Sequence, residues 1–156
     1  MKSRGPEFKS PRAHIVLCFI YMSIMEYKNP RLTVDAIILK GESVVLVKRG
    51  IEPFKGMWAL PGGHVDYNEK VEHAVIRETK EETGLDVKIE KLIGVYSDPK
   101  RDPRGHRVAI CYLCAITGGI QKANDDAVEV MEFKLSDLPD LAFDHGIMME
   151  DVKKQL

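Results

Sequence analysis

The spacing of apolar residues along this chain predicts where strands and helices lie. From Arg31 onward, apolar and β-branched residues form two runs, Leu32–Leu39 and Val44–Val47, on either side of Lys40-Gly41-Glu42. Two such runs joined by a short glycine turn are typical of a β-hairpin. By the same reasoning we predict strands at Trp58–Leu60, Val87–Tyr96, Arg107–Ile116 and Val128–Phe133, loops at Arg49–Met57 and Ser97–His106, and a turn at Pro61–Gly63.

Two segments are predicted to be helices. The first runs from about Asn68 to Thr83, with Asn68 as its N-cap and Gly84 as the left-handed residue that closes it. The second, from Asp144 to Leu156, is amphipathic. Strands and helices alternate irregularly, and the helices suffice to cover two faces of one mixed sheet. The predicted fold class is therefore α/β.

The first helix carries acidic residues on its apolar side. At ~100° per residue, Glu78 and Glu82 share a stripe with Val71 and Val75, and Glu81 flanks that stripe. Like charges at this spacing repel, and acids near a helix C-terminus oppose the helix dipole. Partly buried carboxylates need partners, and a hard divalent cation such as Mg²⁺ takes oxygen ligands. The spacing therefore indicates a metal site.

The alternative interpretation of an acidic helix is a solvated charged face. We accept it as the default for Glu69, Glu72 and Lys80. It does not suit the other three acids, because their side of the helix is the apolar one. The two sets of charges are thus expected to have different surroundings.

Composition limits the partners and the compartment. The chain has 156 residues and a net charge of −1, which predicts one domain without general attraction to nucleic acid or to a membrane. Its three cysteines, Cys18, Cys111 and Cys114, do not form a disulfide framework. Cys111 and Cys114 fall three apart in a predicted strand and so point to opposite faces. Buried free thiols in a cytoplasmic protein are the expectation.

The first 24 residues differ from the rest. Basic residues precede an apolar run, Ile15–Met25, that is too short to span a bilayer and lacks a small-residue cleavage pattern. We interpret residues 1–24 as an extension that is non-native or results from an upstream start, with Met25 as the true initiator. Residues 25–156 then form the single domain.

One motif in the predicted acidic helix resembles a known family. Gly63, Glu69 and the segment Arg77–Leu85 match the spacing GX5EX7REUXEEXGU of the Nudix box at every fixed position. Thr79 stands where the pattern has a bulky apolar residue, and its methyl group can pack there. The likeness extends from about Leu32 to Pro139. It implies a Nudix-type α/β/α sandwich around a mixed β-sheet, and Mg²⁺- or Mn²⁺-dependent hydrolysis of the pyrophosphate in nucleoside diphosphates linked to another moiety.

The resemblance also implies roles for individual residues. Glu78 and Glu82 would be metal ligands, Glu81 a ligand or a water-orienting carboxylate, and Gly62 would offer its backbone carbonyl to the metal. Arg77 is expected to pair with Glu69 or Glu81 and so to hold the ligands in place. The general base differs between family members. Our candidate is Glu129, in the acidic segment 125–129, with Glu81 as the alternative; a plain surface turn is the other interpretation of that segment.

The substrate is predicted from a basic loop, Lys100–Arg107, whose guanidinium groups could bind phosphates. A solvated loop without a specific role is the competing interpretation. Pro99 lies roughly fifteen residues past the box, as in ADP-ribose pyrophosphatases of this family, so we favour ADP-ribose, hydrolysed to AMP and ribose 5-phosphate. Trp58 could stack on adenine, although such a residue is more often a core aromatic. The predicted substrate contacts are Arg49, Arg101, Arg104, His106 and Trp58.

Two other functions remain open from the sequence. A nucleotide-pool sanitiser would hydrolyse oxidised nucleoside triphosphates with the same box. A non-catalytic ADP-ribose sensor would be expected to lose box residues, and here the box is complete. A homodimer is an expectation from the resemblance alone.

Overall fold

The computed structural model describes residues 28–123 and 125–155. The predicted extension, residues 1–24, lies outside the described residues, as do Cys18 and Met25. Its origin and the domain boundary at residue 25 stay predictions.

Strand β1 (Arg31–Lys40) lies at the centre of a mixed sheet, which has seven strands in the described residues. It pairs in parallel with β6 (Arg107–Gly119) and antiparallel with β2 (Ser43–Arg49) and β4 (Gly62–His64). Strand β5 (Leu85–Tyr96) extends the sheet beyond β6, and both β3 (Trp58–Ala59) and β7 (Ala127–Lys134) pair with β2. The predicted hairpin is confirmed, since β1 and β2 meet at Gly41.

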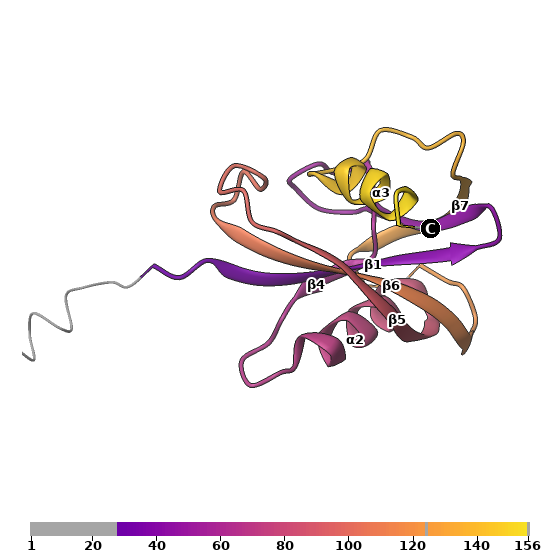
Figure 1. The fold of residues 1–156 in the computed structure, drawn as a ribbon, viewed down its shortest axis with the longest axis horizontal. Coiled ribbons are helices and arrows are strands. Elements are labelled where there is room, and N and C mark those ends of the chain that lie inside the picture. The colour runs from indigo at the N-terminus through magenta and orange to yellow at the C-terminus, as the bar shows by residue number, and fades with distance from the viewer. Residues whose placement is uncertain (1–27, 124, 156) are drawn as a thin grey trace, which may run out of the picture.

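Two helices cover opposite faces of the sheet (Figure 1). Helix α2 (Val71–Thr83) packs on one face and α3 (His145–Lys153) on the other. The predicted α/β/α arrangement is confirmed. None of the helices in the described ranges is long and apolar enough to cross a membrane.

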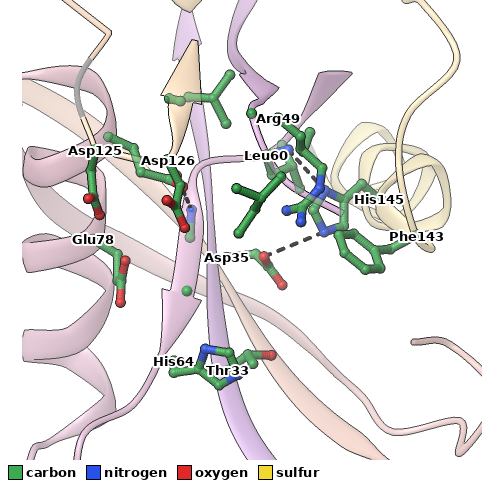
Figure 2. A pocket seen from close by; sticks show the side chains of 18 of the residues that line it. Thr33, Asp35, Arg49, Leu60, His64, Glu78, Asp125, Asp126, Phe143 and His145 are labelled. Atoms are coloured by element: carbon green, nitrogen blue, oxygen red, sulfur yellow. Dashed lines mark hydrogen bonds and ion pairs between the residues drawn. The ribbon is translucent and has the colours of Figure 1, made fainter. Parts of the chain in front are cut away.

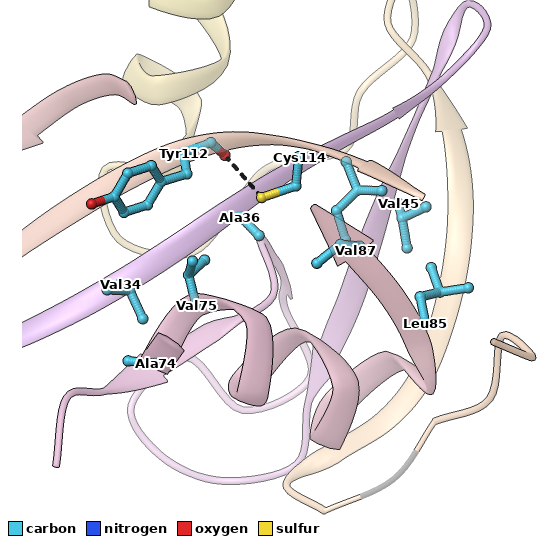
Figure 3. Packing of buried hydrophobic residues seen from close by; sticks show 10 residues of the cluster. Val34, Ala36, Val45, Ala74, Val75, Leu85, Val87, Tyr112 and Cys114 are labelled. Carbon is cyan, nitrogen blue, oxygen red and sulfur yellow. Dashed lines mark hydrogen bonds between the residues drawn. The ribbon is translucent and has the colours of Figure 1, made fainter. Parts of the chain in front are cut away.

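The two layers explain why the central strands read as continuous apolar runs. Alternate residues of β1 enter different clusters: Val34, Ala36 and Ile38 pack with α2, and Ile37 packs with α3. Figure 3 shows the α2 cluster, in which Ala74 and Val75 meet the sheet. A strand that is buried on both faces needs apolar side chains at consecutive positions, because successive side chains point to opposite faces.

The paired cysteines follow the same alternation. Cys114 lies in the α2 cluster and Cys111 in the α3 cluster, and both are free and buried. Burial raises the pKa of each thiol, to about 12 for Cys114. The prediction of two buried, unpaired thiols on opposite faces is confirmed.

The start of helix α2 differs from the prediction. The helix begins at Val71 with Lys70 as its N-cap, and Lys70 makes no capping hydrogen bond from its side chain. Asn68, the predicted cap, has a positive φ of 66° in the turn before the helix. In that turn the Glu69 carboxylate accepts the N–H of Asp66 at 3.0 Å, so a local turn replaces the predicted first helical residues.

The predicted turn at Pro61–Gly63 is in part a strand. Gly62 and Gly63 belong to β4 and lie opposite Asp35 and Val34 of β1. A Cβ atom at Gly62 would overlap the Val34 carbonyl oxygen, which explains why glycine can lie against β1 here. The close approach brings β4 between β1 and helix α2.

Candidate active site

A cavity of about 250 Å³ opens beside β4, between the side of the molecule that carries α2 and the side that carries α3 (Figure 2). Charged side chains from both sides line it. The acidic ones are Asp35, Glu78, Glu82, Asp102, Asp125 and Asp126. The basic ones are Lys48, Arg49, Arg101 and Arg104, and two histidines, His64 and His145, join them.

Helix α2 supplies two carboxylates to the cavity, Glu78 and Glu82. An oxygen of Glu82 accepts the Gly62 backbone N–H at 2.9 Å, which fixes the helix to β4. The Glu78 side chain is only 14% exposed and lies against Gly63, where a Cβ would overlap its carboxylate. Gly63, the first glycine of the box, is therefore needed for the approach of Glu78.

Burial perturbs both carboxyl groups. It raises the pKa of Glu82 to about 8, against the opposing effect of the Gly62 N–H and with added repulsion from Glu78 and Asp35. Burial also raises the pKa of Glu78, while Arg77 acts in the opposite direction. Two desolvated carboxylates that repel each other are the environment in which a cation is most favourable.

The donor set fits a hard divalent cation of the kind that keeps water ligands. Within residues 28–123 and 125–155, no three His, Cys, Asp or Glu side chains converge into a closed metal site. Mg²⁺ is generally held by one or two carboxylates together with waters and substrate phosphates, without an all-protein cage. Glu78 and Glu82, with their oxygens facing the cavity beside the Gly62-Gly63 backbone, meet that requirement.

Arg77 makes the ion pairs that the sequence predicts. Its Nε and Nη2 donate to the two oxygens of Glu69, both at 2.8 Å. Its Nη1 donates to Glu78 at 2.9 Å and to Glu81 at 3.0 Å, and its Nη2 also reaches the His64 carbonyl at 3.1 Å. Hydrogen bonds from Arg77 lower the pKa of Glu69 to about 2. Arg77 thus ties the α2 acids to β4 and to the turn before the helix.

Two of the predicted catalytic acids lie outside the cavity lining. Glu81 has a side chain that is 45% exposed and paired with Arg77. Glu129, on β7, pairs across the sheet with Lys48 and lies 3.3 Å from its ammonium group. Ala127 of β7 and Lys48, the cross-strand partner of Glu129, do line the cavity, so Glu129 lies next to the lining without belonging to it. Asp125 and Asp126 of the same acidic segment do line the cavity.

Two arginines face the cavity from the α3 side. The guanidinium groups of Arg49 and Arg104 lie 4.9 and 5.4 Å from the ring centre of Phe143. Arg49 donates from Nε to the Pro53 carbonyl, and its buried Nη2 has no hydrogen-bond partner among the described residues. Burial, followed by repulsion from Arg104, lowers the pKa of Arg49. A bound anion would accept a hydrogen bond from this Nη2 and would reduce the repulsion between the two guanidinium groups.

Arg101 lines the cavity but is already paired. Its Nε and Nη2 donate to the carboxylate of Asp144 at 2.8 and 2.6 Å, and its side chain is 4% exposed. This bidentate pair fastens the loop after β5 to the start of α3. Because both of these donors are used by Asp144, the geometry favours a structural role for Arg101 and does not support its predicted contact with substrate.

Trp58 and His106, also predicted to contact substrate, lie elsewhere. The Trp58 ring packs edge-on against Phe133, with centres 4.7 Å apart, in the α3-side cluster. His106 is exposed and has its Nε2 3.3 Å from the Ser97 carbonyl oxygen. Neither residue lines the cavity. Trp58 follows the commoner pattern of a core aromatic.

The structure also brings residues to the cavity that the sequence did not single out. Asp35 alternates into the α3 side of β1 and is 6% exposed, and burial raises its pKa to about 7. His145, at the start of α3, is buried, and burial lowers its pKa to about 3. A charged residue inside an otherwise apolar strand was the one available signal for Asp35. His64 adds a buried Nε2 without a hydrogen-bond partner in the described part of the chain.

Fold and site together define an α/β/α sandwich with a cavity that places the carboxylates of Glu78 and Glu82 in the same lining as the guanidinium groups of Arg49 and Arg104. The family model for the NUDIX domain matches residues 29–152 of the sequence, and the chain belongs to this family.

Similar proteins agree with this assignment. The chain is 52% identical over 125 residues to an ADP-ribose pyrophosphatase of Methanocaldococcus jannaschii, covering 80% of this chain and 74% of the relative. It is 37% identical over 98 residues to a putative 8-oxo-dGTP diphosphatase of Bacillus subtilis, covering 63% and 60%. The NUDIX domain of Shewanella oneidensis NrtR, solved with ADP-ribose, superposes with a TM-score of 0.73 at 28% identity, covering 88% of this chain and 97% of that one.

Proposed function

We propose that this protein hydrolyses the pyrophosphate bond of ADP-ribose, giving AMP and ribose 5-phosphate, with Mg²⁺ or Mn²⁺ as cofactor. The observation that carries the proposal is the cavity itself, in which Glu78 and Glu82 face Arg49 and Arg104. Hydrolysis of a pyrophosphate is helped by a bound cation and by positively charged side chains, which together neutralise the charge on the phosphate oxygens. The ADP-ribose pyrophosphatase that is 52% identical supports ADP-ribose as the substrate.

The α2 side would hold the metal. Glu78 and Glu82 would be its carboxylate ligands, and Gly62 would add its backbone carbonyl. A bound divalent cation supplies charge neutralisation on the phosphate oxygens and makes a bound water more acidic. Arg77 orients Glu78 from outside the cavity, and the Gly62 N–H orients Glu82. These contacts hold both carboxylates in place before any substrate arrives.

The α3 side would bind phosphate oxygens through its two arginines. Among the described residues, the Nη2 of Arg49 has no hydrogen-bond partner, and a third of the Arg104 side chain is exposed. Asp102 accepts from Nε and Nη2 of Arg104 at 3.0 and 2.7 Å and so fixes the direction of this guanidinium group. Their positive charge would orient the pyrophosphate in line with the attacking water.

The general base belongs to the acidic loop before β7. Asp125 and Asp126 line the cavity near Glu78, as Figure 2 shows. We propose that one of these two carboxylates accepts the proton of the attacking water, in the place where the sequence predicted Glu129. Separate Asp125→Asn and Asp126→Asn variants, assayed for the release of AMP, identify which one.

A second candidate substrate is an oxidised nucleoside triphosphate, as the Bacillus subtilis relative suggests. The test is a panel of ADP-ribose, 8-oxo-dGTP, dGTP and NADH, assayed with Mg²⁺ for kcat/KM and for the identity of the products. Preference for ADP-ribose with release of AMP supports the proposal. Preference for 8-oxo-dGTP would show that an oxidised nucleoside triphosphate, and not ADP-ribose, is the substrate. Binding of ADP-ribose without any turnover would show that the protein is a sensor and not an enzyme.

The remaining expectations concern setting and assembly. We propose a cytoplasmic protein that acts on a small nucleotide substrate, with neither nucleic acid nor membrane as a partner. A homodimer stays a prediction from the family resemblance. Sedimentation velocity of the purified chain decides the oligomeric state.

A further inference from the structure

His145 lies beneath the cavity and contacts the chain just before Gly62. Its side chain is 5% exposed. Its Nδ1 accepts the backbone N–H of Leu60 at 2.9 Å, and its Nε2 lies 3.5 Å from Oδ1 of Asp35. Figure 2 shows the ring between these two groups, with an interaction drawn to each. One imidazole therefore joins three separate elements: α3, the segment before β4, and β1.

The hydrogen bond to Leu60 determines where the ring proton is. A nitrogen that accepts a hydrogen bond carries no proton, so the neutral ring carries its proton on Nε2, the atom that faces Asp35. The ring is thus fixed at Nδ1 by the Leu60 hydrogen bond, and its Nε2 faces Asp35 at 3.5 Å. An apolar replacement would leave the buried Leu60 N–H without an acceptor.

The segment that His145 holds leads directly to the proposed metal site. Leu60 and Pro61 are buried, and the Pro61 carbonyl accepts the Ala36 N–H at 2.8 Å. The next residue, Gly62, donates its N–H to Glu82. A shift of Leu60 would therefore move the Gly62 peptide and the Glu82 carboxylate together.

Attachment of α3 to the sheet does not depend on this histidine. Met148, Met149 and Val152 are fully or almost fully buried in the α3-side cluster. Tyr96 also donates a hydrogen bond from its hydroxyl to Asp151, at the far end of the helix, at 3.1 Å. Apolar packing and this second polar contact attach the helix, so the polar contacts of His145 have a separate role.

We propose that His145 is a positioning residue, which fixes the segment Leu60–Gly62 and thereby the Gly62 backbone and the Glu82 carboxylate that would hold the divalent cation. The inference rests on the metal site of the proposed function, but it does not require ADP-ribose to be the substrate. It assigns a role to a residue that is more than 80 positions away from Gly62 in the sequence.

Two amide variants separate this role from simple filling of space. In His145→Asn, the side-chain oxygen can take the position of Nδ1 and accept the Leu60 N–H; in His145→Gln, the amide extends toward the position of Nε2. Gln is closer to His in size, so if His145 only fills space, the Gln variant should keep more of the Mn²⁺ affinity. If His145 acts by positioning Leu60, the Asn variant should keep more of it. Tyr96→Phe is the control, because it removes a polar contact of α3 far from Leu60.

The primary measurement is Mn²⁺ affinity of the whole protein, by electron paramagnetic resonance without substrate. We expect His145→Gln to weaken Mn²⁺ binding about 10- to 100-fold, the usual effect of losing a residue that orients a metal ligand. We expect His145→Asn to stay within about threefold of the wild type, since its acceptor is retained. Tyr96→Phe should bind Mn²⁺ like the wild type. Amide exchange at Leu60 should be fast only in His145→Gln.

Other results overturn the proposal. Equal Mn²⁺ affinity in the Asn and Gln variants would do so, as would a better performance of Gln or an equal loss in Tyr96→Phe. Failure of the wild type to bind Mn²⁺ contradicts both this inference and the proposed function. Mn²⁺ binding with the predicted order of variants, but without turnover of ADP-ribose, contradicts the proposed function alone.

Discussion

The α2 side and the α3 side of the cavity are built in different ways. On the α2 side, Arg77, Glu78 and Glu82 come from the last turns of one helix, and the two glycines that receive the carboxylates are adjacent in sequence. On the α3 side, Asp35, Arg49, Arg104 and His145 come from four separate parts of the chain. The first side is a local motif, and the second exists only in the folded protein.

The difference explains which half of the site tolerates change. Helical periodicity fixes the α2 acids relative to one another, and Arg77 and the Gly62 N–H fix them relative to β4. The α3 side is held by pairs between distant segments, such as Arg101 with Asp144. We therefore expect changes on the α2 side to abolish chemistry, and changes on the α3 side to alter affinity and stability.

The largest effect is expected from the α2 carboxylates. Glu82→Gln and Glu78→Gln each remove a proposed metal ligand, so kcat for ADP-ribose should fall by more than the roughly 100-fold that loss of an orienting neighbour can cost. Glu72→Gln, an exposed change in the first turn of the same helix, is the control. Steady-state kinetics with Mg²⁺ measure the effect. A kcat within a few-fold of the wild type for Glu82→Gln would remove its assignment as a ligand.

A smaller effect is expected from Arg77. Arg77→Gln breaks the bidentate pair with Glu69 and frees Glu78, and kcat should fall about 10- to 100-fold while the Mg²⁺ concentration for half-activation rises. Lys80→Gln, on the same helix, loses only exposed contacts with Asp86 and the Gly84 carbonyl among the described residues and should have little effect. Equal losses in the two variants would show that general helix stability, and not orientation of Glu78, is involved.

On the α3 side, Arg104→Gln and Arg49→Gln should raise KM for ADP-ribose about 3- to 10-fold with a smaller change in kcat, because each removes one charged contact to a partly exposed phosphate. Lys100→Gln, in the same loop as Arg104 but outside the cavity lining, is the matched control. A fall in kcat as large as that of the Glu82 variant would end the distinction between the two sides.

The smallest predicted effect is on the pH dependence of stability. His145 has a folded pKa of about 3, below its unfolded value, so its contribution to stability is present above about pH 6.5 and is lost as the pH falls toward 3. Asp35 has a folded pKa of about 7, above its unfolded value, so its contribution is present below about pH 4 and is lost as the pH rises through 7. Between pH 7 and 4 the two contributions oppose each other.

Thermal unfolding of two variants separates these contributions. When the pH is lowered from 7 to 4, the Tm of His145→Asn should fall less than that of the wild type, and the Tm of Asp35→Asn should fall more. Arg49, Arg101 and Asp144 also surround these groups and are unchanged in both variants. Parallel Tm curves for all three proteins would show that neither group has a shifted pKa in the fold.

The sequence alone predicted the local half of the molecule well. Hydrophobic periodicity located the hairpin, both helices and the alternation that sends Cys111 and Cys114 to opposite faces. It misplaced the start of α2 because the Glu69 side chain forms a turn with Asp66 that competes with the helix. It read Pro61–Gly63 as a turn, since two glycines do not reveal that a strand lies against them.

The distant half of the site could not be read in the same way. His145 looks like any lone histidine until the fold places it beside Leu60 and Asp35. Arg101 and Arg104 are nearly adjacent, equally basic and each paired with an aspartate, yet only the fold shows that the Arg101 side chain is buried whereas a third of the Arg104 side chain is exposed. Pairing between distant segments depends on tertiary contacts, which spacing in a single sequence does not contain.

The most direct test of a metal-dependent site formed by both sides is the rate of AMP release from ADP-ribose by the wild-type protein, before and after removal of divalent cations with EDTA. We predict rapid release of AMP and ribose 5-phosphate with Mg²⁺, loss of this activity in EDTA, and recovery when excess Mg²⁺ or Mn²⁺ is restored. Turnover that continues undiminished in EDTA, or no turnover of ADP-ribose with either metal, would contradict it.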